Sequence, residues 1–341
     1  MRTIEWKNGV VATIDQTLLP DEEAWLEIRS CVEVADAIRK MKIRGAPLIG
    51  VAAAYGLALT AYYSEAKTRE AFIEEIERAA DILRGTRPTA VNLFWAIERV
   101  LKKVKGSAGD VEVLRRLAID EAQRIADEDV EVNRRIGEHG SKLIEDGDTI
   151  LTHCNAGRLA TVDYGTALAV IRAAKEEGKR VKVIATETRP KLQGSRLTTY
   201  ELMRDGFSVT LITDNMVGYL MFKGAVDKVI VGADRVVRDA VINKIGTYTI
   251  AVLAKEHNIP FYVAAPLSTF DLNAFARDVV IEERDPSEVT HIGSVRVAPL
   301  GVNVLNPAFD ITPIKYVDAV ICEAGILGKE YFERLYERKN I

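Results

Sequence analysis

Four short segments in the second half of the sequence end in residues that could carry out chemistry. The four ends are His153-Cys154-Asn155-Ala156-Gly157, Thr186-Glu187-Thr188-Arg189-Pro190, Thr213-Asp214-Asn215 and Gly232-Ala233-Asp234-Arg235. Thiols and carboxyl groups can move protons, and guanidinium groups bind phosphate oxygens. The four segment ends are therefore rich in groups that could act on a polar substrate or bind it.

Cys154 has a plain interpretation and a functional one. A lone cysteine is most often a small buried hydrophobe, which is how we interpret Cys31 and Cys322. Cys154 instead precedes Asn155 and Gly157, so its sulfur could lie near amide donors that favour a thiolate or stabilise developing negative charge. Its neighbours therefore permit a catalytic role, and from residue types alone the plain interpretation stays open.

His153 beside Cys154 suggests a thiolate–imidazole pair. Adjacent residues of a strand point to opposite faces, however, so the two side chains are poorly placed for one another. We therefore predict that His153 belongs to the core or supports the site.

The elements that position these residues form a parallel sheet. The runs TILTH, KRVKVIATE, FSVTLIT, DKVIVGA and IPFYVAA have strand length and alternate with amphipathic segments. This pattern predicts an α/β fold with a Rossmann-like, doubly wound parallel sheet, in which ligands bind beyond the carboxyl ends of the strands. No GxGxxG, GxxxxGK[ST], CxxC or HxxxH pattern is present, so we expect no cofactor and no metal site.

The first half of the chain is predicted to be mainly helical. A short hairpin turns at Asn8-Gly9, and Ser30 and Glu33 have capping-box spacing. Helices are then expected in the alanine-rich run after Pro47 and in the ranges 68–83, 88–104 and 110–144. We predict two domains, a mainly helical one at 1–146 and a Rossmann-like catalytic one at 147–341.

Composition narrows the class of protein. The chain has 341 residues, 48% of them hydrophobic and 28% charged, with a net charge of -4, so it offers no broad positive field for nucleic acid. Three widely spaced cysteines favour a reducing compartment. We detect no signal peptide and no apolar run near membrane-spanning length, so we expect a cytoplasmic protein with no membrane partner.

Seven motifs carry a family resemblance. They are RGAPLIGVAAAYG (44–56), TRPTAVNLFWAI (86–97), LTHCNAG (151–157), ETRPKLQGSRLT (187–198), TDNM (213–216), GADRV (232–236) and NKIGTY (243–248). In order and over nearly the whole chain, they resemble the methylthioribose-1-phosphate isomerase family. Its wider group includes ribose-1,5-bisphosphate isomerase and the alpha, beta and delta subunits of initiation factor 2B. The resemblance implies a helical domain on a Rossmann-like domain, a homodimer, and a small sugar phosphate as the ligand.

The resemblance also implies a reaction. The family converts an aldose 1-phosphate to the ketose 1-phosphate in methionine salvage, and an acid must help to open the ring. Asp234 matches the proton donor and Cys154 its catalytic partner; an enolate and a hydride shift both remain open. An Asp after a strand is otherwise a common cap or turn former, but the flanking Gly-Ala and Arg235-Val236 favour catalysis.

The family's substrate contacts fall on seven residues of this chain: Arg44, Gly45, Ala46, Arg87, Gln193, Asn243 and Lys244. Each has a plainer alternative, such as a surface charge, a turn glycine, or a helix cap in the case of Gln193. Arg44 and Arg87 stand before predicted helix starts, where amide dipoles and a charged fork could converge on phosphate. The sequence departs from the family pattern at VVRDAVI (236–242), just before Asn243, and again at 273–280.

Three functions stay open at this point. They are a methylthioribose-1-phosphate isomerase, an isomerase of another pentose 1-phosphate such as ribose 1,5-bisphosphate, and a non-catalytic regulatory subunit. A regulatory subunit has no chemical need for both Cys154 and Asp234, so we rank it last. Neutral and apolar motif residues such as Phe94, Met216 and Tyr219 favour a substrate with an apolar C5 group over a bisphosphate.

Overall fold

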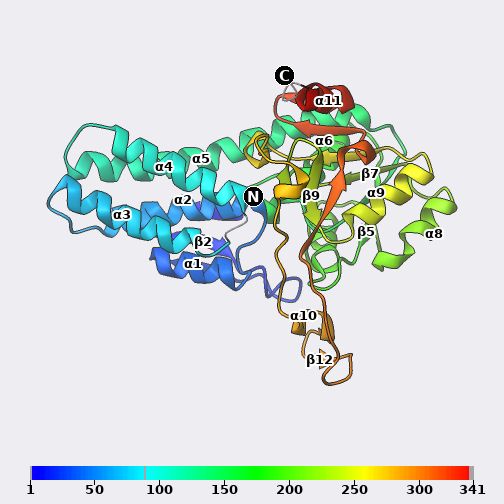
Figure 1. Ribbon diagram of the computed structural model, residues 1–341, viewed down its shortest axis with the longest axis horizontal. Helices are drawn as coiled ribbons and strands as arrows, with labels where there is room; N and C mark the ends of the chain where they lie inside the picture. The colour runs from blue at the N-terminus through cyan, green and yellow to red at the C-terminus, as the bar shows by residue number, and fades with distance from the viewer. Residues whose placement is uncertain (1, 88–89, 338–341) are drawn as a thin grey trace. The chain divides into compact units, whose positions relative to one another are not determined.

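A computed structural model describes residues 2–87 and 90–337 of the chain (Figure 1). By its internal contacts the chain divides into two compact units. Unit 1 comprises residues 1–134 and 157–165, and unit 2 comprises residues 135–156 and 166–341. The boundary that we predict between residues 146 and 147 separates domains that fold independently. The two units are defined by their internal contacts instead, so this boundary stays a prediction.

Unit 1 opens with a small antiparallel sheet of β1 (Ile4–Trp6), β2 (Val11–Ile14) and β3 (Trp25–Ile28). The predicted hairpin turn is confirmed, because Asn8 and Gly9 both have positive φ angles, 46° and 85°, and join β1 to β2. Two successive left-handed residues match the right-handed twist of the flanking strands.

The helices of unit 1 form its core. They are α1 (Cys31–Arg39), α2 (Ala46–Tyr63), α3 (Arg69–Arg84), α4 (Val91–Gly106) and the first part of α5 (Val111–Gly140). The predicted cap of α1 is confirmed, because the Ser30 hydroxyl accepts a hydrogen bond from the Glu33 amide at 3.2 Å. The predicted helix at 88–104 is present as α4, while its expected first residues, Pro88 and Thr89, lie outside the described residues.

Helix α2 packs against α1, α3 and α4. Its 18 residues carry no charge and are long and apolar enough to cross a membrane, so the expectation that no such run exists was wrong. Most of this helix is buried inside the protein, which is the behaviour of a core helix. Small residues along α2 explain the close packing, because a Cβ at Gly50 would lie 2.8 Å from the Asn92 carbonyl oxygen of α4.

Unit 2 is built on a seven-stranded sheet with the order β15-β14-β10-β7-β4-β5-β6. The strands are β4 (Thr149–Thr152), β5 (Lys182–Thr186), β6 (Ser208–Ile212), β7 (Lys228–Val231), β10 (Phe261–Ala264), β14 (Ala319–Cys322) and β15 (Gly325–Gly328). All neighbours pair in parallel except β15, which is antiparallel. The predicted Rossmann-like sheet is confirmed, with all five predicted strands in it.

The helices of unit 2 connect its strands. They are α6 (Ala167–Glu176), α7 (Thr199–Arg204), α8 (Val217–Phe222) and α9 (Thr247–Glu256), and a π-helical turn at Gly194–Thr198 leads into α7. A further helix, α11 (Lys329–Glu337), follows the last strand, β15. The end of α5 also belongs to this unit.

Two antiparallel elements of unit 2 were not predicted. A three-stranded sheet joins β8 (Arg235–Val236), β9 (Ala240–Lys244) and β13 (Phe309–Pro313). The chain between β9 and β13 also carries α10 (Ser287–Thr290) and the hairpin β11 (His291–Ile292) to β12 (Val295–Arg296), which project away from the sheet in Figure 1. The first of these elements carries two of the predicted substrate contacts, because Asn243 and Lys244 lie on β9.

Candidate active site

The site is built where the strand order of the large sheet reverses. The chain places β5 and β6 on one side of β4, and then β7, β10 and β14 on the other side. At such a reversal the loops after two neighbouring parallel strands diverge, which leaves a crevice at their carboxyl ends. Cys154 follows β4 and Asp234 follows β7, its neighbour in the sheet. The two predicted catalytic residues therefore lie at the same edge, on either side of the reversal.

The loops that carry Cys154 and Asp234 are in direct contact. A Cβ added at Gly232 would lie 2.7 Å from the Cβ of Ala156, so only glycine allows this approach. The Asp234 amide donates a hydrogen bond to the Ile242 carbonyl of β9 at 2.9 Å. Asp234 is thus anchored between the large sheet and the β8–β9 hairpin.

Cys154 is held through its backbone. Its amide donates to the Thr188 hydroxyl at 2.9 Å, and its carbonyl accepts from the Thr198 hydroxyl at 2.6 Å. Its φ angle is +63°, and Thr188 and Leu192 nearby have φ angles of +64° and +57°. Such conformations are rare for residues with a Cβ, and their cluster at one place is typical of a functional site.

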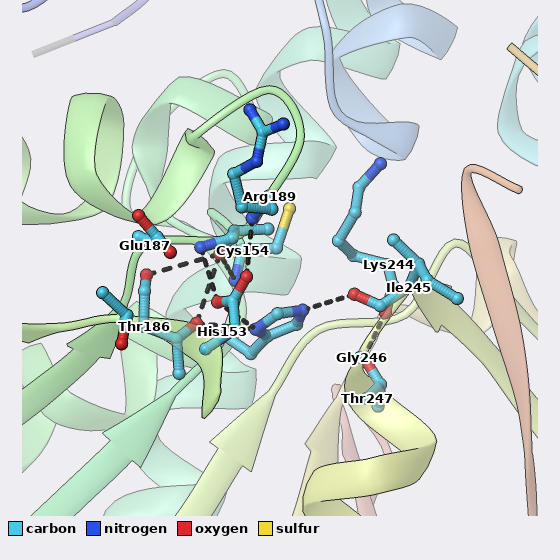
Figure 2. Close-up of polar contacts among 12 residues, drawn as sticks. His153, Cys154, Thr186, Glu187, Arg189, Lys244, Ile245, Gly246 and Thr247 are labelled. Carbon is cyan, nitrogen blue, oxygen red and sulfur yellow. Dashed lines mark hydrogen bonds and ion pairs between the residues drawn. The ribbon is translucent and has the colours of Figure 1, made fainter. Parts of the chain in front are cut away.

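The side chains around Cys154 point in different directions. Figure 2 shows the Cys154 sulfur directed away from the imidazole of His153. His153 is buried and uses both ring nitrogens: Nδ1 lies 2.6 Å from the Thr186 hydroxyl and Nε2 lies 2.8 Å from the Ile245 carbonyl. The prediction that His153 supports the site without pairing with the thiol agrees with these contacts.

Asn243 and Lys244 lie at the end of β9, and both are buried. The Asn243 side chain donates to the Thr247 hydroxyl at 3.0 Å, at the start of α9. The Lys244 ammonium lies 5.0 Å from the ring centroid of Phe309, within the range of a cation–π contact. A buried ammonium on a rigid strand is a group that can bind an anionic ligand.

Gln193 is buried, with 4% of its surface exposed. Gln193 occupies the N-cap position of the turn at Gly194–Thr198, but its side chain makes no capping hydrogen bond there. Within the described part of the chain its Oε1 atom has no hydrogen-bond partner. A buried acceptor without a donor is costly, and a substrate hydroxyl group would satisfy it.

The four other predicted substrate contacts lie in unit 1. Arg44 is buried, and Gly45 has a φ angle of +101°, as the residue before α2. A Cβ at Gly45 would lie 2.5 Å from the Cα of Ala160, so the position requires glycine. Ala46 begins α2, whose first turn has no side-chain cap. Arg87 is half-buried and lies 3.8 Å from the Met41 sulfur.

Three further polar residues of the four segment ends, Asp214, Arg189 and Asn155, make contacts within unit 2. Asp214 accepts from the amides of Thr188 and Arg189, each at 2.7 Å. The Arg189 guanidinium donates to the Val289 carbonyl at 2.8 Å, and Asn155 donates to Glu201 at 2.9 Å. Asp214 and Asn155 therefore hold the loops that follow β5 and β4.

Sequence reasoning missed three threonines at the site, Thr186, Thr188 and Thr198. Their hydroxyl groups contact His153 or the Cys154 backbone. The available signal was that all three lie within the ETRPKLQGSRLT motif or directly before it. Threonine is common at strand ends for β-propensity alone, so its type did not single these positions out.

Comparisons with known proteins place the chain in a family. The family model described as "Initiation factor 2 subunit family" matches residues 42–329. Methylthioribose-1-phosphate isomerase of Syntrophotalea carbinolica is 56% identical over 338 residues, covering 98% of each chain. The crystal structure of 5-methylthioribose 1-phosphate isomerase from Pyrococcus horikoshii has a TM-score of 0.91 at 48% identity, covering 99% of this chain and 96% of that chain.

A second solved structure carries another name. It is the translation initiation factor eIF-2B, subunit delta, from A. fulgidus, with a TM-score of 0.88 at 55% identity, covering 99% of each chain. Both names fall within one family, and the match extends along almost the whole length. The chain therefore belongs to the initiation factor 2 subunit family, in which its relatives include methylthioribose-1-phosphate isomerases.

Proposed function

We propose that this protein converts 5-methylthioribose 1-phosphate to 5-methylthioribulose 1-phosphate, as a cytoplasmic homodimer in methionine salvage. The observation that carries the proposal is the 56% identity over 338 residues with an isomerase of that name. The positions of Cys154 and Asp234 at the reversal of the sheet support it, because this is where the fold binds ligands.

In the proposed reaction Asp234 gives a proton to the ring oxygen, and the bond between that oxygen and C1 breaks. Hydrogen then moves from C2 to C1, while the C2 hydroxyl loses its proton to become the ketone. The hydrogen can move as a proton through an enolate, with Cys154 as the base, or as a hydride in a pocket that Cys154 lines. In either case no atom is gained or lost.

Binding of the phosphate and the sugar is assigned to the seven residues of the family pattern. The charged groups Arg44, Arg87 and Lys244 suit a phosphate dianion. Gly45 and Ala46 offer the uncapped amides at the start of α2, which favour an anion. Gln193 and Asn243 supply amide groups for sugar hydroxyls, and the unsatisfied Oε1 of Gln193 supports this role.

The second candidate is a regulatory subunit, and the name of the A. fulgidus structure favours it. Turnover of the purified protein on a panel of pentose 1-phosphates separates the candidates. We expect product from at least one aldose 1-phosphate, seen by NMR as the ketose. Absence of turnover on the whole panel, together with stable binding to other initiation-factor subunits, would favour the regulatory role.

A further inference from the structure

His153 makes hydrogen bonds through both nitrogens of its ring, in addition to its packing contacts. It follows β4 directly and is buried between the end of β5 and the turn after β9. A Cβ at Gly246 would lie 3.1 Å from the Nε2 and Cε1 atoms of His153, so the turn presses against the imidazole edge. His153 thus links the end of β4, which also carries Cys154, to the turn that follows Lys244.

The contacts of His153 determine which nitrogen carries its proton. The Ile245 carbonyl can only accept a hydrogen bond, so Nε2, at 2.8 Å, must be the donor. In the neutral ring Nδ1 then accepts from the Thr186 hydroxyl at 2.6 Å. Burial lowers the pKa of His153 and the nearby Lys244 charge lowers it further, while the Ile245 carbonyl and the Asp214 carboxylate, 4.0 Å from Nδ1, act in the other direction.

The Thr186 proton is therefore committed to His153, which makes Thr186 an acceptor toward its other neighbour. The Thr188 hydroxyl lies 3.3 Å away and can donate to it, with the Thr186 carbonyl oxygen as a second acceptor at 3.4 Å. The Thr188 oxygen in turn accepts from the Cys154 amide at 2.9 Å. With this assignment, each donor from the Cys154 amide to the His153 ring donates to the next group in the series, and the last acceptor is the Ile245 carbonyl.

We propose that His153 is a positioning residue in a one-directional hydrogen-bond chain. The chain runs from the Cys154 amide through the Thr188 and Thr186 hydroxyl groups to His153. As the neutral Nε2–H tautomer, His153 then donates to the Ile245 carbonyl. The chain holds Cys154 in its left-handed conformation and links it to the turn next to Lys244. This role rests on the proposed function, in which Cys154 acts in the reaction and Lys244 binds phosphate.

Substitutions at the two ends of the hydrogen-bond chain should have different kinetic effects. Thr188→Val keeps the β-branched shape but removes the acceptor of the Cys154 amide. We expect kcat to fall about tenfold or more with little change in KM, and the Cys154 amide to exchange its hydrogen about tenfold faster. His153→Asn keeps an acceptor for Thr186 and loses the Ile245 contact, so we expect KM to rise more than kcat falls.

Thr312→Val is the matched control. Thr312 is buried in β13 of the same unit, and within the described residues its hydroxyl has no hydrogen-bond partner. This variant should leave the kinetics and the exchange of the Cys154 amide unchanged. It therefore separates the loss of the hydrogen-bond chain from the loss of a buried hydroxyl.

The tautomer can be read in the wild-type protein without substrate. Nitrogen-15 NMR of labelled histidine should show His153 neutral, with its proton on Nε2, at about pH 7. An imidazolium or a proton on Nδ1 would overturn the proposal, as would Thr188→Val matching Thr312→Val in both kcat and amide exchange. If the wild type lacks isomerase activity, the proposed function fails. The NMR and amide-exchange results still decide whether the hydrogen-bond chain from Cys154 to Ile245 exists.

Discussion

The hydroxyl groups of Thr188 and Thr198 hydrogen-bond the backbone of Cys154 at the end of β4, and neither hydrogen-bonds its thiol. Within the described residues, no side chain or backbone group hydrogen-bonds the Cys154 sulfur. A half-buried thiol without a structural partner is available to a ligand, whereas Cys31 and Cys322 are buried in the cores of their units. The three cysteines thus differ in environment as their sequence contexts suggested.

The first prediction concerns the catalytic pair. Asp234→Asn removes the proton donor and Cys154→Ser replaces the thiol by a much weaker acid, so each should lower kcat by on the order of 10²–10⁴. Steady-state kinetics give the effect, and thermal unfolding should show that both variants remain folded. Turnover near that of the wild type in either variant would remove that residue from the mechanism.

The second prediction concerns the phosphate clamp. Lys244→Ala deletes a buried ammonium, so it should weaken competitive inhibition by inorganic phosphate about tenfold or more. Lys102→Ala, at an exposed position of α4, is the control and should leave inhibition unchanged. Equal inhibition constants for the two variants would mean that Lys244 does not contact the phosphate.

At the scale of elements, the main sheet could be predicted because five of its strands are short runs rich in β-branched residues that alternate with amphipathic segments. β14 and β15 were missed, since AVIC and GILG are too short to show a period and follow a long irregular stretch. The β8–β9–β13 sheet was missed because β9 pairs with β13, about 70 residues away, and no local pattern encodes such pairing. The positions of Asn243 and Lys244 on a strand followed only from that pairing.

The sequence also did not predict where two backbone segments approach one another closely. A Cβ at Gly194 would lie 1.7 Å from the Thr186 carbonyl oxygen, so the turn at Gly194–Thr198 can dock on the end of β5 only with glycine there. The motif contained this glycine, but its reason is the contact with a strand that precedes it in the chain. The same applies to Gly45 against Ala160.

The third prediction follows from this docking. Gly194→Ala must displace either the turn or β5, so it should destabilise the protein by more than about 1 kcal/mol and lower kcat. Gly328→Ala in β15 is the control, because a Cβ there meets no atom within 4 Å and its φ angle is not positive. Chemical denaturation of both variants measures the difference. Equal stabilities would show that the close approach is not required.

The fourth prediction concerns the start of α9, where Asp310 accepts from the amides of Gly246 and Tyr248 at 2.7 and 3.1 Å. Burial raises the pKa of Asp310 to about 6, although these amides and Lys244 favour the charged form. The folded protein then binds more protons at this group than the unfolded chain does between pH 4 and 6. The contribution of Asp310 to stability is thus present below about pH 4 and is lost as the pH rises through 6.

Comparison of the wild type with Asp310→Asn tests this sign. Between about pH 4.5 and pH 7.5 the unfolding free energy of the wild type should fall relative to that of the variant, by a difference of the order of 2 kcal/mol. Groups other than Asp310 titrate in both proteins and cancel. Parallel stability curves would show that Asp310 has the same pKa in the folded and unfolded states.

At the scale of the whole molecule, the nine predicted site residues are divided between the two units. Arg44, Gly45, Ala46 and Arg87 belong to unit 1, and the remaining five residues belong to unit 2. The family motifs indicated these positions, whereas composition and periodicity alone gave only the helical half and the sheet. Local sequence patterns alone would not have grouped these nine positions into one predicted set.

The substrate is also a property of the whole protein, because an apolar C5 group and a C5 phosphate require opposite linings of the pocket. The most direct measurement is therefore kcat/KM of the purified wild type for 5-methylthioribose 1-phosphate and for ribose 1,5-bisphosphate under the same conditions. We predict a preference of about a hundredfold or more for the methylthio sugar. Equal efficiency, or a preference for the bisphosphate, would contradict the proposed function.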